Sequence, residues 1–194
     1  MIIRARSIRR AIGLVLTALA VSWCVQALAA DAIETVVRSS AASQPAPGLT
    51  IAYRDMDSFH GGTAIEIRGD GTFLRWDSAG MREAYTAVES EGKIEASRLA
   101  PLLKMLVDLE AWRQLTPERR GVPDESRASL VLSAGSDRSF VWEWYNEMQA
   151  NKRIVLIRDQ METLAPKGTQ HCVLPFPPRS SQSPPGIRTC KGPA

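Results

Sequence analysis

Two carboxylates and a histidine lie close together in one short segment, where they could bind a cation. Asp55, Asp57 and His60 occupy the stretch DMDSFHGGT. Carboxylate oxygens and imidazole nitrogens are common metal ligands. The ligand set is incomplete, however, and short polar stretches beside Gly-Gly usually form turns. We therefore expect no bound metal, and we keep a metal-dependent enzyme or hydrolase that uses this loop as the alternative.

The other combinations that could support catalysis are weaker. Ser58 stands two residues from His60, and no third residue is evident that would orient a nucleophile and a base. His171 precedes Cys172 and could lower the pKa of its thiol, which loses its relevance if the cysteine is oxidised. The Gly69-Asp70-Gly71 triplet is not followed by a helical pattern, as a phosphate-binding loop would be. We expect no cofactor, and the sequence favours a protein that is not an enzyme.

An aromatic segment, SFVWEWY, is the best candidate for a partner surface. Strand periodicity divides it into two faces, with Phe140, Trp142 and Trp144 on one and Val141, Glu143 and Tyr145 on the other. Exposed rings, Trp142, Trp144 and Tyr145 among them, would suit a peptide, glycan or protein partner. Because large aromatic side chains are mostly buried, we favour the other interpretation, in which the rings fill the core.

The N-terminus has the three parts of a secretory signal peptide. Four arginines precede the apolar run Ala11–Val25, and Ala27-Leu28-Ala29 supplies a small-residue cleavage pattern. Residues 1–29 are thus a predicted signal peptide, which places the protein in the periplasm or the medium. An uncleaved anchor is the alternative, because the apolar run is nearly long enough to span a bilayer. After cleavage we expect no membrane association.

Cleavage also changes the charge and the cysteine count. The whole chain of 194 residues has 24 basic and 21 acidic residues, and removing the four leading arginines leaves 20 basic residues. Such a balance gives no reason to expect a nucleic-acid partner. Cys172 and Cys190 remain, and an even pair in an exported protein predicts a disulfide. It would close the proline-rich tail at 166–194.

A hairpin is predicted where Asp70-Gly71 stands between alternating apolar residues. A two-residue turn of this type fixes the strand register. The expected pairs are Gly69–Thr72, Ile67–Leu74, Glu66–Arg75 and Ile65–Trp76. This register gathers the apolar side chains on one face, whereas a shift of one residue would mix the two faces.

The remaining patterns predict an α+β domain over residues 48–165, after a linker at 30–47 with a short helical start. Further strands are expected at Leu49–Arg54, Arg82–Glu89, Arg127–Ser133 and Ser139–Tyr145. Helices are expected at Ser97–Trp112, capped by Ser97, and at Asn151–Leu164, capped by Asn151. Because the strands are joined by short connections, we expect an antiparallel sheet of about six strands built from hairpins, with two helices packed on one face.

The order of these motifs resembles a bacterial family of small exported α+β domains of unknown function. The similar features are Ile65-Glu66-Ile67 with Asp70-Gly71, the lead-in Gly92-Lys93-Ile94 to the helix Leu99–Leu109, and Asp124–Leu132 before the second hairpin. The resemblance covers about residues 48–165 and implies an exported domain without a known activity. We expect a non-catalytic module that binds an unknown protein or envelope component. A structural envelope domain with no discrete ligand is a further alternative.

Overall fold

The structure is a computed structural model that describes residues 32–43, 46–55, 61–79, 85–115, 125–168 and 171–174. The predicted signal peptide lies outside these ranges. Within them, no helix is both long enough and apolar enough to cross a membrane.

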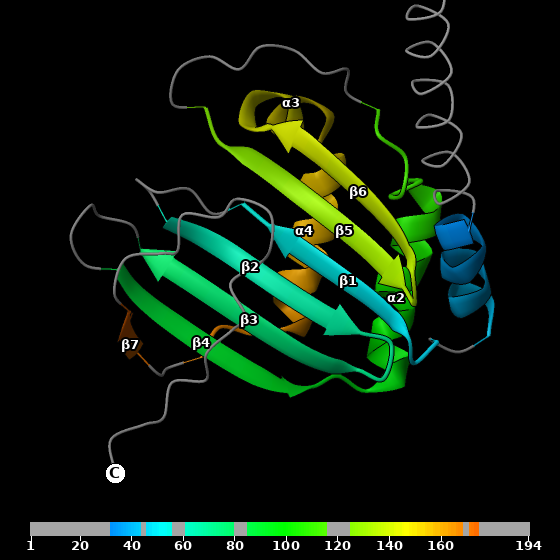
Figure 1. The fold of residues 1–194 in the computed structure, drawn as a ribbon, viewed down its shortest axis with the longest axis horizontal. Helices are drawn as coiled ribbons and strands as arrows, with labels where there is room; N and C mark the ends of the chain where they lie inside the picture. The colour runs from blue at the N-terminus through cyan, green and yellow to red at the C-terminus, as the bar shows by residue number, and fades with distance from the viewer. Residues whose placement is uncertain are drawn as a thin grey trace, which may run out of the picture.

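Within these ranges, seven antiparallel strands form one sheet (Figure 1). They are β1 (Leu49–Arg54), β2 (Gly61–Arg68), β3 (Thr72–Ala79), β4 (Tyr85–Lys93), β5 (Arg127–Ala134), β6 (Asp137–Trp144) and β7 (His171–Leu174). Their order across the sheet is β6-β5-β1-β2-β3-β4-β7. The α+β class predicted from the sequence is confirmed. One strand was not expected, because β7 lies in the tail that was predicted to be irregular.

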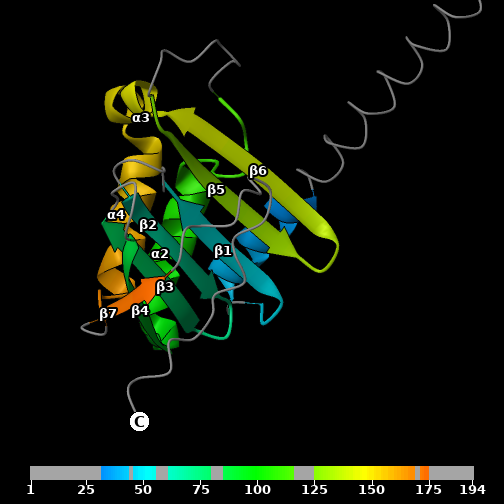
Figure 2. The same cartoon turned by 60° about the vertical axis from the view of Figure 1, so that its left-hand side comes forward.

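The helices are α2 (Ala96–Asp108), α3 (Tyr145–Asn151) and α4 (Arg153–Leu164), together with a helix over residues 32–42 near the N-terminus. In Figures 1 and 2, α2 and α4 lie behind the strands, and the N-terminal helix, in blue, lies beside α2. The side chains that α2 and α4 bury belong to the same hydrophobic core as those of β1, β2 and β5. We call the opposite side of the sheet its outer face.

Both predicted helices carry the expected apolar stripes, but their ends differ from the prediction. Leu99, Leu102, Leu103 and Leu106 of α2 are buried, as are Ile154, Ile157, Met161 and Leu164 of α4. The N-cap of α2 is Glu95, not Ser97, and it makes no side-chain capping bond. Helix α4 begins after Lys152, whose left-handed backbone separates it from α3.

The segment predicted as a linker contains an ordered part of the domain. Residues 32–42 are helical, and Ile33 and Val37 are fully buried in the core. These two residues are four apart and therefore share one face of the helix. This helical spacing is difficult to recognise in an alanine- and serine-rich segment, because only two large apolar side chains show it.

The register predicted for the β2–β3 hairpin is wrong by one residue. Ile67 pairs with Phe73 and Ile65 pairs with Arg75, so the loop has a third residue, Gly71, with a φ of 87°. A left-handed residue at this position is typical of three-residue hairpin loops. The carbonyl oxygen of Gly71 accepts a 2.8 Å hydrogen bond from the Ile94 backbone N–H, which ties the loop to the end of β4.

This register sends side chains to unexpected faces. Arg75 and Asp77 turn to the core side with Ile65 and Ile67 and are buried, whereas Leu74 and Trp76 lie on the outer face and are half-buried. Alternation along a strand makes each shift of one residue exchange the faces completely. The predicted apolar face, which combined Ile65 and Ile67 with Leu74 and Trp76, therefore does not form. Arg75 and Asp77 lie beside the two isoleucines instead.

We predict that Gly71→Ala lowers the free energy of unfolding by about 3 kcal/mol or more, because an L-residue is strained there and its Cβ would collide with the Ile94 carbonyl. Gly135→Ala is the matched control. It also has a positive φ, 60°, but open space around the added Cβ, so about 1 kcal/mol is expected. Urea denaturation measures both losses. Equal losses would show that the contact with Ile94 contributes nothing.

Candidate functional site

The aromatic side chains of β6 lie on the outer face of the sheet. Ser139, Val141 and Glu143 point to the core side and are buried. Phe140 is 55% exposed, and Trp142 and Trp144 are half-buried. The interpretation that these rings fill the core is therefore wrong.

The two indoles of β6 hold one another and an arginine in place. The rings of Trp142 and Trp144 meet edge to face, with centroids 5.6 Å apart and an angle of 84° between their planes. The Arg127 guanidinium of β5 lies 4.8 Å from the Trp142 centroid and 4.7 Å from the Trp144 centroid. Such cation–π contacts stabilise a fixed arrangement. We call Phe140, Trp142, Trp144 and Arg127 the aromatic surface.

Tyr145, the third aromatic residue predicted for a partner surface, does not continue the strand. It is the first residue of α3 and is 51% exposed. Its backbone N–H donates a 3.0 Å hydrogen bond to the carbonyl oxygen of Ser126, just before β5. It therefore lies at the border of the aromatic surface, where the chain turns from sheet to helix.

A buried ion pair explains why the tryptophans face outward. Glu143, between them in sequence, is fully buried, and one of its carboxylate oxygens lies 3.2 Å from Nη2 of Arg153 at the start of α4. Arg153 also donates a 2.8 Å hydrogen bond from Nη1 to the carbonyl oxygen of Arg113. With Glu143 on the core side, alternation places both neighbours on the outer face. The signal that sequence reasoning missed was Arg153, a cation within an otherwise apolar helix start.

A side chain binds the free edge of β6 at Trp142. Gln114, which follows α2, donates a 2.7 Å hydrogen bond from Nε2 to the Trp142 carbonyl oxygen. It also accepts a 2.9 Å bond at Oε1 from the Trp142 backbone N–H. One amide side chain thus satisfies both backbone groups of an edge-strand residue.

The predicted metal loop is represented among the described residues by Asp55 alone, because Asp57 and His60 lie outside them. Both oxygens of the Asp55 carboxylate are engaged: Oδ2 accepts the Tyr53 hydroxyl at 2.8 Å, and Oδ1 accepts the Thr63 backbone N–H at 2.6 Å. Within the described ranges, no group of three acidic, histidine or cysteine side chains is placed to hold a metal ion. Asp55 closes the end of the β1–β2 pair.

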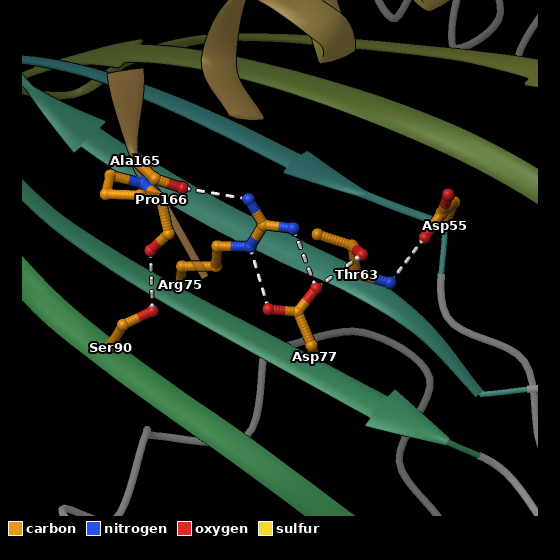
Figure 3. A network of polar contacts seen from close by, with 7 residues as sticks. All are labelled: Asp55, Thr63, Arg75, Asp77, Ser90, Ala165 and Pro166. Carbon is orange, nitrogen blue, oxygen red and sulfur yellow. Dashed lines mark hydrogen bonds and ion pairs between the residues drawn. The ribbon is translucent and has the colours of Figure 1, made fainter. Parts of the chain in front are cut away.

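A second polar cluster continues from Thr63 into the core (Figure 3). The Thr63 hydroxyl donates to Asp77 Oδ1 at 3.0 Å. Arg75 holds the same carboxylate with two bonds, 2.7 Å from Nε and 2.9 Å from Nη2, and donates from Nη1 to the Ala165 carbonyl oxygen at 2.9 Å. The Thr63–Asp77 bond joins β2 to β3, the Arg75–Asp77 bonds lie within β3, and the Arg75–Ala165 bond joins β3 to the end of α4. This cluster serves architecture, since its donors and acceptors satisfy one another.

A groove of about 750 Å³ lies away from the aromatic surface, between the end of α2 and the α3–α4 junction. Leu115, 55% exposed, and Leu156, 46% exposed, give it an apolar wall. Acidic side chains, Asp108, Glu110 and Glu147, line it as well. The groove therefore combines exposed apolar side chains with acidic ones.

Only one cysteine of the predicted Cys172–Cys190 disulfide lies among the described residues. Cys172 lies in β7, opposite Ala87 of β4. Cys190 lies outside the described residues. The pairing of the two cysteines stays a prediction.

We predict that Asp77→Asn lowers the free energy of unfolding by about 3 kcal/mol, because it leaves the buried Arg75 guanidinium without a counter-charge. Asp108→Asn is the matched control. It removes the carboxylate of the solvent-exposed Lys104–Asp108 pair, and a change below about 0.5 kcal/mol is expected. Chemical denaturation of the two variants measures the difference. Similar small losses in both would show that the Arg75–Asp77 pair adds no stability.

Burial, and then the neighbouring Asp55 carboxylate, raise the pKa of Tyr53 well above its ordinary value. The unfolded chain releases this proton near pH 10, and the folded chain keeps it. Tyr53 therefore supports the folded state below about pH 10, and its contribution is lost at higher pH by about 1.4 kcal/mol per pH unit. We predict that Tyr53→Phe weakens the fall in unfolding free energy between pH 9 and pH 11, measured by urea titration. An unchanged slope would contradict this.

The described surface thus offers a rigid aromatic patch with a cation and no assembled catalytic group. Its ring positions come from β6 and its guanidinium from β5. In comparisons with known proteins, no family model matches the chain and no curated protein matches it.

Proposed function

We propose that this chain is an exported, non-catalytic binding domain whose aromatic surface contacts a partner protein or a component of the cell envelope. The observation that carries the proposal is the exposure of Phe140, 55%, beside the two fixed indoles. Contiguous exposed apolar side chains on a folded domain mark interaction sites more often than chance placement does. Export is supported by the signal-like N-terminus, and the periplasm or the medium is the proposed location.

The composition of the aromatic surface suits a contact that binds tightly through few residues. Tryptophan and arginine are enriched among the residues that dominate binding energy at interfaces. Arg127 is already held over both indoles, so binding restricts little further rotation of these side chains. The surrounding sheet supplies a rigid base, because β5 and β6 are paired along their full length.

The enzyme alternative that uses Asp55, Asp57 and His60 has no geometric support among the described residues. The hydrogen bonds to Asp55 come from Tyr53 of β1 and Thr63 of β2, so the carboxylate acts as a structural acceptor. The alternative of a structural domain without a ligand differs from the proposal in one respect. It gives no reason for an exposed phenylalanine beside two ordered tryptophans.

We expect Phe140→Ser to reduce capture of the partner from envelope extract at least tenfold, because the exposed ring is lost from the centre of the contact. The immobilised chain, its variants and quantitative mass spectrometry of the captured material provide the measurement. We expect the fold to be retained, since the ring is more than half exposed.

Leu156→Ser is the matched control. It removes a comparably exposed apolar side chain from the groove between α2 and α4, and unchanged capture is expected. If Leu156→Ser abolishes capture and Phe140→Ser does not, the partner surface is the groove, and the proposal is wrong.

A further inference from the structure

β6 is the last strand at one end of the sheet, so one side of its backbone has no neighbouring strand among the described residues. Trp142 directs its N–H and carbonyl oxygen away from β5, where the Gln114 amide binds both. Backbone groups of alternate residues in an antiparallel strand point to the same side. Phe140 and Arg138 therefore present their N–H and carbonyl groups along the same edge.

The Gln114 side chain shows what kind of group fits this edge. A primary amide has one carbonyl acceptor and N–H donors, the same groups as the peptide unit of a neighbouring strand. The Gln114 amide thus makes the hydrogen bonds to one residue of β6 that an added strand would make to several residues along the same edge. Proteins cover exposed edges in this manner to prevent unwanted strand pairing. A side chain can leave such a position without unfolding any element.

We propose that an extended segment of a partner protein adds to β6 as an eighth strand and displaces the Gln114 amide from Trp142. The inference rests on the proposed function and specifies how the partner binds. Main-chain hydrogen bonds along the edge supply affinity in strand addition, and alternate side chains supply specificity. Every second side chain of the added segment lies beside Phe140 and Trp142 on the outer face.

The charges on the outer face of β6 and of the two strands next to it define the chemistry of this segment. Alternation and strand pairing place Arg54, Arg127 and Arg138 on the outer face of β1, β5 and β6. The other described outer-face residues of these three strands are neutral. They are Thr50, Ala52, Ser129, Val131, Ser133, Phe140, Trp142 and Trp144. The complementary occupant is an extended segment that alternates acidic and apolar residues.

The test uses fluorescent peptides with the purified chain and fluorescence polarisation. The probe is an acetylated, amidated peptide with three Glu-Val repeats. One control has three Lys-Val repeats, and the other has the Glu-Val sequence with every second backbone nitrogen methylated. We expect the Glu-Val peptide to bind at least tenfold more tightly than either control, because the charge or the main-chain donors are lost in them.

Variants of the chain test the role of Gln114. Gln114→Ala should bind the Glu-Val peptide about tenfold more tightly than the original chain, since two hydrogen bonds no longer need to break. Gln149→Ala, the same change at an exposed position of α3, should leave binding unaltered. Phe140→Ser should weaken binding of the peptide, as it weakens capture of the envelope partner.

Four results would overturn the strand-addition proposal. Equal binding of the methylated peptide would show that main-chain hydrogen bonds are not used. Failure of the Glu-Val peptide to bind, while envelope capture stays dependent on Phe140, would leave the proposed function intact and reject this mode. Unchanged peptide binding by Gln114→Ala would show that the amide is not displaced. Dimerisation of Gln114→Ala in sedimentation experiments would assign the edge to a second copy of this chain.

Discussion

The position of α4 depends on two arginines that tie its ends to the sheet. At its start, Arg153 reaches Glu143 of β6, and past its end the carbonyl oxygen of Ala165 accepts from Arg75 of β3. Removing a guanidinium and a carboxylate from water is unfavourable by several kcal/mol per ion, unless each finds several partners. Arg75 finds three such bonds and Arg153 finds two. These geometric demands restrict α4 to one place on the sheet.

The outer face follows from the same pairs. Because Glu143 of β6 faces the core, Trp142 and Trp144 face outward. Because Arg75 of β3 faces the core, Leu74 and Trp76 face outward as well. The sheet therefore carries apolar side chains on both faces. The core side is covered by helices, and the outer side holds rings that the described helices leave uncovered. The aromatic surface and the buried charges both follow from the alternation of side chains between the two faces of each strand.

Much of the architecture could be predicted from local patterns. The leucine stripe of α2 and the strand sequences are periodic over many residues, and the pattern of their burial follows that period. The hairpin register depended on a single residue in its loop, Gly71, whose placement is set by a hydrogen bond to Ile94. Local sequence contains the turn residues but not that distant contact.

The candidate site was harder to predict, for a related reason. Charged residues in strands are expected to face water, so Arg75 and Glu143 indicated the wrong face. One partner of Arg75 lies far away in the sequence: Ala165 is 90 positions from it. The identity of the aromatic residues was visible, but their exposure depended on the pairing of Glu143 with Arg153. No periodicity of β6 alone contains that information.

The pairing of β4 with β7 has a consequence for the order in which the molecule can assemble. β7 brings His171 against Val88, and Pro166 accepts a hydrogen bond from Ser90. Such distant contacts close slowly, because a long loop must first be ordered. The hairpins nearer the N-terminus can form as soon as they exist. β4 acquires its second neighbour only after residues 171–174 are present, so this part of the sheet forms after the hairpins that precede it.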